Sequence, residues 1–139
     1  MSLASCIFCK IVKGEIPCFK LLESETALAF MDVGPIARGH CLVIPKYHAR
    51  TLTDLPDEEM SDILPFTKKI AQATGAEHYN VLQNNGRWAH QEVDHVHFHL
   101  IPKPVADKSA GLGIDWPSQK MSMDDIKVVY EELKGKIGN

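Results

Sequence analysis

Apolar and polar residues alternate most regularly at residues 95–102, which read His-Val-His-Phe-His-Leu-Ile-Pro. An alternation with a period of two residues predicts a β-strand, because successive side chains of a strand point to opposite faces. His95, His97 and His99 should therefore share one face of a sheet, with neighbouring side chains about 6.6–6.8 Å apart. The opposite face is apolar, as is typical of a strand that packs against a core.

Similar apolar runs, bounded by glycine, proline or charged residues, predict four more strands. An acidic cluster at residues 54–59 predicts the start of a long helix, and Pro65 should kink this helix or displace its start. Ser122 should cap a last helix. Because strands and helices do not alternate regularly, the sequence predicts an α+β fold with a mainly antiparallel sheet. The expected strands span residues 19–23, 26–31, 40–44, 79–83 and 95–101, and the expected helices span residues 6–12, 54–73 and 123–133.

The composition limits the functions that need to be considered. With 139 residues, 45% of them hydrophobic and 24% charged, the chain resembles one globular domain of ordinary composition. A formal net charge of −3 argues against binding to nucleic acid or to an anionic membrane surface. The sequence has no apolar run of 18 residues, and residues 1–5 lack the features of a signal peptide. We therefore expect an intracellular protein without a membrane span.

Four cysteines occur, and two of them form a Cys-x-x-Cys pair at Cys6 and Cys9. Disulfides are rare in reducing compartments, so this pair indicates metal or redox chemistry. Cys18 and Cys41 lie in predicted apolar strands and are interpreted as buried thiols.

The pattern His-x-His-x-His-x-x resembles the motif that gives the histidine-triad (HIT) family its name, and the resemblance extends over most of the chain. Within the family, the sequence is most similar to the Hint branch of adenosine 5′-monophosphoramidases in its fungal form. The resemblance implies one HIT domain over residues 1–139, with a five-stranded sheet and two main helices. The other matching segments are Cys6-Ile7-Phe8-Cys9-Lys10-Ile11, Ala29-Phe30-Met31-Asp32, the run from Gly39 to His48, and Asn84-Asn85-Gly86.

The resemblance also implies a homodimer in which the sheets of the two protomers join. Residues 103–139 would contribute to the dimer and to the active site, and Trp116 matches a tryptophan that reaches the partner's site. The expected location is the cytoplasm, with the nucleus as a second compartment.

The activity implied by the resemblance is hydrolysis of purine nucleoside phosphoramidates, or of aminoacyl-adenylate-like substrates, to the nucleoside monophosphate. His97 matches the nucleophile, which forms a covalent nucleotidyl-histidine that water then cleaves. A neutral imidazole can attack phosphorus when its second nitrogen donates a hydrogen bond. His99 matches the phosphate donor, and His95 and His48 support the nucleophile. No metal is required at phosphorus if such donors neutralise the phosphate oxygens.

The substrate-binding residues follow from the same resemblance. Asp32 matches the residue that accepts hydrogen bonds from the ribose hydroxyls, and Asn84 and Gln91 match donors on the phosphate side. Asp32 and Asn84 also suit the turns in which they lie. The apolar slot for the base could equally be plain core packing. This slot consists of Phe8, Ile11, Ile16, Phe30 and Val33.

The sequence departs from the family at Glu92, where many members carry serine or threonine shortly before the triad. A hydroxyl that faces the leaving group is thereby replaced by a carboxylate, which leaves the substrate preference open. The alternative is a Glu92 side chain that points to solvent.

A zinc site is the second expectation from the resemblance. His48 and His95 stand at positions that supply zinc ligands in related galactose-1-phosphate uridylyltransferases. With Cys6 and Cys9 they form a Cys₂His₂ set, which suits a closed structural site with tetrahedral zinc. The alternative is that both cysteines are reduced core residues and that the two histidines form a hydrogen-bonded chain behind His97.

Two other functions stay open at this point. Hydrolysis of dinucleoside polyphosphates, as in the Fhit branch, uses the same nucleophile and differs in its leaving-group contacts. Trp116-Pro117 favours the Hint branch over this alternative. A nucleotide- or metal-binding regulatory scaffold without turnover belongs to another class of protein.

Overall fold

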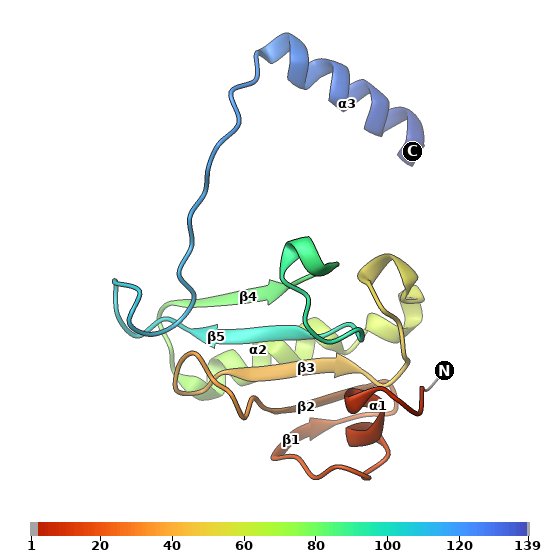
Figure 1. Cartoon of the computed structure of the whole chain (residues 1–139), viewed down its shortest axis with the longest axis vertical. Helices are drawn as coiled ribbons and strands as arrows, with labels where there is room; N and C mark the ends of the chain where they lie inside the picture. The colour runs from red at the N-terminus through yellow and green to blue at the C-terminus, as the bar shows by residue number, and fades with distance from the viewer. Residues whose placement is uncertain (1–2, 139) are drawn as a thin grey trace.

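The computed structural model describes residues 3–138, and its strands form a five-stranded sheet (Figure 1). The order is β1-β2-β3-β5-β4, and each neighbouring pair is antiparallel. The predicted α+β fold with a mainly antiparallel sheet is therefore confirmed. Residues 1–2 and 139 of the predicted domain lie outside the described residues. The strands are β1 Lys20–Glu23, β2 Ala27–Met31, β3 Cys41–Pro45, β4 Tyr79–Gln83 and β5 Phe98–Pro102.

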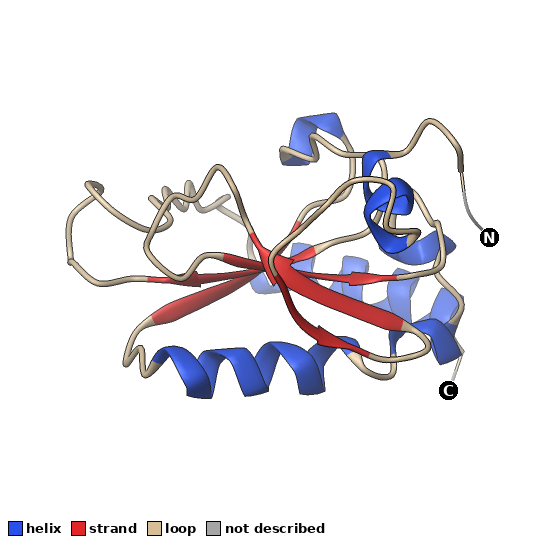
Figure 2. Ribbon diagram, turned by 90° about the horizontal axis from the view of Figure 1, so that it is seen from below, coloured by secondary structure: helices blue, strands red, loops and turns tan. Residues whose placement is uncertain are grey.

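The two faces of the sheet pack against different helices (Figure 2). In β2, Ala27 and Ala29 belong to a core shared with α2, whereas Leu28 and Phe30 belong to a core shared with α1. Successive residues of β2 point to opposite faces of the sheet and therefore contribute alternately to the two cores. The candidate site lies on the face that α1 and the loops cover. The two helices are α1 Ile7–Val12 and α2 Ile63–Thr74.

The helix predicted over residues 54–73 is wrong in its first part. Two short 3₁₀ turns, Leu52–Asp54 and Asp57–Met60, precede α2, which begins only at Ile63. Pro65 lies in the first turn of α2, where a backbone N–H has no intrahelical acceptor to lose. The proline therefore displaces the start of the helix, which is one of its two expected effects.

The strand predicted at residues 95–101 also needs correction, because β5 begins at Phe98 and leaves His95 and His97 before it. This segment is held by other bonds. The backbone N–H of Val96 donates to the carbonyl of Ala49 at 2.8 Å. The carbonyl of His95 accepts a hydrogen bond from the imidazole of His97.

The C-terminal segment stands apart from the sheet (Figure 1). After β5, a loop and an extended connection lead to α3 (Met123–Ile137), which Ser122 caps as predicted. All of α3 is exposed, so its apolar side chains have no partner among the described residues of this chain. They include Met123, Ile126, Tyr130, Leu133 and Ile137. Of the helices within residues 3–138, none is long and apolar enough to cross a membrane.

Candidate active site

The backbone holds His97 in one orientation. Its Nδ1–H donates to the carbonyl of His95 at 2.7 Å, and its ring lies edge-on to Phe8 with the ring centroids 5.1 Å apart. A donating Nδ1 leaves the lone pair of the neutral ring on Nε2. His97 is only 6% exposed, yet it lines a cavity of about 1160 Å³. It therefore presents a nitrogen that can attack a substrate without first losing a proton.

His40 and His99 together fix the position of a hydrogen-bond donor beside the nucleophile. The backbone N–H of Ile36 donates to His40 Nδ1 at 3.2 Å, which places the proton of neutral His40 on Nε2. His40 Nε2 lies 2.9 Å from His99 Nδ1, so His99 accepts there and carries its own proton on Nε2. Both rings line the cavity. One backbone amide thus sets the tautomers of two successive imidazoles.

Burial keeps these imidazoles neutral at ordinary pH. Desolvation lowers the pKa of His97 and of His40, and it lowers the pKa of His99 to about 4 with help from the positive charges of the protonated His97 and His40. The carboxylates of Asp32 and Glu92 partly oppose the shift at His97. A neutral nucleophile and a neutral donor therefore coexist near pH 7.

One end of the cavity carries the residues expected to bind the base and the ribose. All five residues of the predicted apolar slot line it, with Val33 at its exposed rim. Asp32 lines it too, and the turn expected as its alternative role is present as well. Its Oδ1 accepts from the N–H of Gly34 at 2.7 Å, and its Oδ2 lies 3.4 Å from His40 Nε2.

The loop that follows β4 also lines the cavity. Asn84 lines the cavity while its Nδ2 donates to the carbonyl of Ala89 at 2.7 Å. Gln91 does not line the cavity, and the expectation that it donates to the phosphate is corrected. Its side chain is 1% exposed, accepts from the N–H of Gly86 and donates to two backbone carbonyls. Gln91 therefore holds the loop in place.

The predicted metal ligands meet behind His97. His95 donates through Nε2–H to the carbonyl of Pro45 at 2.8 Å, so its Nδ1 lone pair faces the other ligands. That Nδ1 lies 3.4 Å from Cys6 Sγ, 3.6 Å from Cys9 Sγ and 3.2 Å from His48 Nδ1. A tetrahedral zinc site has edges of roughly 3.6 Å between nitrogen and sulfur and roughly 3.4 Å between two nitrogens. The donor set fits zinc.

The cluster and the cavity are two separate compartments. Cys6, Cys9, His48 and His95 do not line the cavity, and the sulfur of Cys9 lies 3.4 Å from His48 Nδ1. Burial lowers the pKa of His95 to about 4, which keeps its ring available as a neutral ligand. The cluster adjoins the catalytic centre through the backbone of residues 95–97 and through Phe8 of α1, whose ring lies edge-on to the rings of both His95 and His97.

Comparison with known proteins agrees with this geometry. Residues 13–105 match the HIT domain. The chain belongs to the HIT family. It is 59% identical over 133 residues to an adenosine 5′-monophosphoramidase of Schizosaccharomyces pombe, a match that covers 96% of this chain and 98% of that protein. It is 53% identical to the adenosine 5′-monophosphoramidase of Saccharomyces cerevisiae. This match covers 96% of this chain and 84% of the yeast protein.

Solved HIT structures show the same fold. A crystal structure of a histidine triad nucleotide-binding protein from Candida albicans is 50% identical, covers 96% of this chain and 97% of the other, and has a TM-score of 0.89. The HIT match ends at residue 105, so α3 and the connection that contains Trp116 lie beyond it. Trp116 is 82% exposed and lines the open side of the cavity within its own chain.

Sequence reasoning missed His40 as a functional residue of this HIT protein. It was part of the matching run after Gly39, but nothing in its spacing separates it from a structural histidine. The signal lies in the register of the sheet, because Leu42 of β3 pairs with His99 of β5. His40, the residue just before β3, is thereby brought beside His99.

Proposed function

We propose that this HIT protein hydrolyses purine nucleoside 5′-phosphoramidates, or related aminoacyl-adenylates, to the nucleoside monophosphate. The observation that carries the proposal is the locked tautomer of His97. Its proton is fixed on Nδ1 by a backbone carbonyl, and its free nitrogen belongs to a cavity large enough for a nucleotide. The names of the fungal relatives support the same reaction.

The reaction proceeds in two displacements at phosphorus. His97 Nε2 forms a bond to the α-phosphorus, the P–N bond breaks, and the leaving nitrogen takes up a proton and departs as an amine. Water then attacks the phosphorus, the bond to His97 breaks, and AMP and a proton leave. The hydrogen bond to the His95 carbonyl stabilises the positive charge that the ring carries in the covalent intermediate.

Neutral donors bind the phosphate in this scheme. None of the described residues that line the cavity is lysine or arginine. His99, with its proton fixed on Nε2 through His40, donates to a phosphate oxygen. Asn84 lies on the same side, and Asp32 accepts from the ribose hydroxyls. The apolar slot between Phe8 and Val33 holds the base, and its area favours a purine over a pyrimidine.

The Cys₂His₂ cluster is proposed to hold one structural zinc ion. Zinc there would tie α1 to the segment that carries the nucleophile, through Cys6 and Cys9 on one side and His95 on the other. The ion would not contact the phosphate, because its ligands lie outside the cavity.

We also infer a homodimer formed through the edge of the sheet and the C-terminal segment. β4 is an edge strand with half-exposed Tyr79 and Val81, and α3 displays an apolar stripe that none of residues 3–138 covers. A second copy of the chain supplies both with a partner, and Trp116 is then placed to reach an active site. A cytoplasmic or nuclear location stays a prediction.

The test is hydrolysis of an adenosine phosphoramidate by the wild-type chain, by His97→Ala and by His78→Ala, a matched change at an exposed histidine outside the cavity. We expect His97→Ala to lose turnover by more than about 10³-fold, with AMP binding largely kept, and His78→Ala to match the wild type. Mass spectrometry of the quenched wild-type reaction should find a nucleotidyl adduct on His97. Substantial turnover by His97→Ala, or an adduct on another residue, would overturn the assignment.

A further inference from the structure

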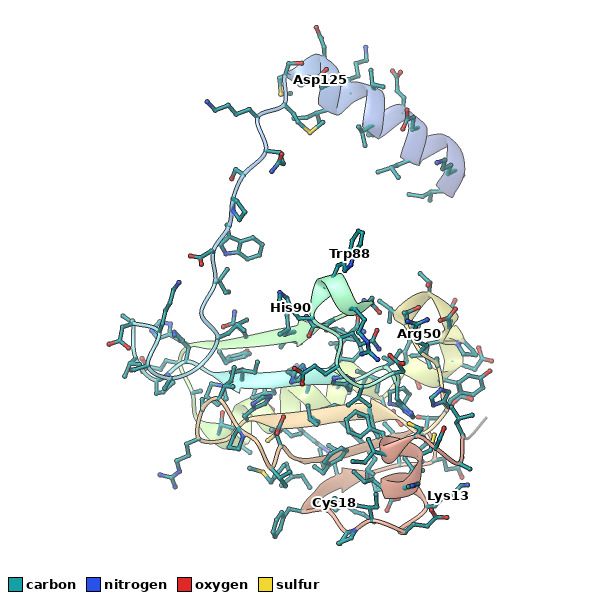
Figure 3. All side chains as sticks on the ribbon, in the orientation of Figure 1. Lys13, Cys18, Arg50, Trp88, His90 and Asp125 are labelled. Atoms are coloured by element: carbon teal, nitrogen blue, oxygen red, sulfur yellow. The ribbon has the colours of Figure 1, made fainter. Side chains whose placement is uncertain are left out.

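The cavity has a defined order from one side of the sheet to the other. The base slot and Asp32 lie over α1, β2 and the segments beside them, and His97 and His99 lie on or next to β5. The loop after β4 also lines the cavity, and Figure 3 shows its residue His90 well away from Cys18. A nucleotide with its base in the slot and its phosphate at His97 has its leaving group in the remaining part of the same cavity, which this loop helps to line.

Glu92 brings a carboxylate to this part of the cavity lining. It lines the same cavity as His97, together with its neighbour Val93. The ion pairs within residues 3–138 do not include Glu92. The nearby cations, Arg50 and Arg87, face Asp94 instead. The carboxylate of Glu92 is therefore uncompensated.

The backbone that carries Glu92 is held firmly. Arg87 Nη1 donates to the carbonyl of Glu92 at 2.8 Å, and the buried amide of Gln91 ties the loop to Gly86 and Arg50. His90 keeps a left-handed backbone conformation, with φ of 68°, that few residues other than glycine adopt. A loop fixed in this way holds the backbone of Glu92 at a constant position on the cavity lining.

We propose that Glu92 selects the leaving group by its charge, favouring cationic amines, accepting neutral ones and disfavouring anionic groups. The inference rests on the proposed phosphoramidase function and specifies its substrate class. A negative leaving group meets the carboxylate without a lysine or arginine in the cavity lining to offset the repulsion. A leaving group with an ammonium gains an ion pair that is partly screened, because Glu92 is exposed. Nucleoside polyphosphates, as leaving groups of dinucleoside polyphosphates, belong to the disfavoured class.

The experiment compares three adenosine 5′-phosphoramidates whose amines are similar in length. The leaving groups are 1,3-diaminopropane, propylamine and 3-aminopropanoate, which carry a positive, no and a negative charge on the distal group. Each is assayed with the wild type, with Glu92→Gln and with Glu77→Gln, which makes the same change at an exposed glutamate outside the cavity. In Glu92→Gln the ratio of kcat/KM for the cationic and anionic substrates should fall about three- to tenfold.

Glu77→Gln should keep the wild-type ratio, and high salt should shrink the wild-type ratio toward that of Glu92→Gln. An unchanged ratio in Glu92→Gln, or an equal fall in Glu77→Gln, would overturn the role of Glu92 while leaving the phosphoramidase intact. If the wild type hydrolyses none of the three substrates, the proposed function is wrong. In that case, competition binding of AMP and ADP tests the inference about Glu92. Glu92→Gln should bind AMP over ADP with a smaller preference than the wild type, and an unchanged preference would refute the inference.

Discussion

Replacement of His40 by phenylalanine tests whether the protein fixes its phosphate donor through a chain of tautomers. The aromatic ring keeps most of the volume of a side chain that is 4% exposed. It removes the acceptor of the Ile36 N–H, at 3.2 Å, and the donor to His99 Nδ1, at 2.9 Å. His99 is then free to place its proton on either nitrogen and to turn its ring.

The expected loss follows from the bond that holds His99. One hydrogen bond of this kind contributes about 0.5–1.5 kcal/mol, which corresponds to a fall in kcat/KM of roughly two- to thirteenfold. The assay is kcat/KM on the neutral phosphoramidate, at a temperature where circular dichroism shows the variant folded. ¹⁵N NMR of the histidine rings supplies a second readout, because His99 in the wild type should be protonated on Nε2 alone.

His78→Phe, at an exposed histidine, is the matched control for the assay. A folded His40→Phe variant with wild-type kcat/KM would refute the role of His40 as a positioning residue. So would a wild-type ¹⁵N spectrum in which His99 Nδ1 carries the proton.

Three further predictions follow from the metal cluster, the buried imidazoles and the C-terminal segment. Elemental analysis should find about one zinc per chain. The double variant Cys6→Ser with Cys9→Ser should lose the zinc and have a Tm lower by about 5 °C or more, whereas Cys18→Ser should keep the zinc. Metal-free wild-type protein of unchanged Tm would refute the site. Because burial lowers the pKa of His97 and lowers that of His99 to about 4, activity should not fall around pH 6.5 as it would with ordinary imidazoles, and protonation of His99 should reduce it as the pH approaches 4. The folded pKa lies below the unfolded one, so His99 should also make stability decline as the pH falls from about 6.5 toward 4; a kinetic pKa near 6.5 would contradict the assignment. Truncation after Lys108 should leave a folded chain with a weakened dimer, seen by light scattering, and an altered preference among bulky leaving groups; an unchanged dimer and preference would exclude the segment from the site.

Local pattern was enough to predict the sheet, because each strand carries its own signal of alternating or branched apolar residues. It was not enough where tertiary contacts decide the outcome. The acidic residues before Pro65 suit a helix start, but the chain forms 3₁₀ turns there and begins α2 later. β5 starts after His97, and in the residues before it the carbonyl of His95 accepts from the ring of His97 while the N–H of Val96 donates to Ala49.

The roles of site residues were predictable where they belong to the sequence motif. They were not predictable where the contacts of a side chain depend on the tertiary structure. His97 and the cavity residues around the base slot could be named from the motif. His40 could not, since its contact with His99 depends on how β3 registers against β5. Gln91 was misassigned because the sequence shows only that an amide lies near the triad. It does not show that this amide is already hydrogen-bonded to the backbone of Gly86, Arg50 and Val93.

The short helix α1 belongs to both compartments of the protein. The sulfur of Cys6 accepts from the N–H of Cys9 and so caps the helix, while both thiols face the metal cluster. Phe8 and Ile11 of the same helix line the nucleotide cavity. A six-residue helix has little stability of its own. The order of α1 therefore depends on the contacts that its N-terminal residues make.

Metal and nucleotide are therefore expected to be linked thermodynamically through α1. If metal binding orders the helix, it removes part of the entropic cost of closing the base slot, and nucleotide affinity rises. By reciprocity, a bound nucleotide must slow the loss of the metal and raise the metal's affinity by the same factor. The nucleotide content of a cell would then help to set how much of this protein keeps its zinc.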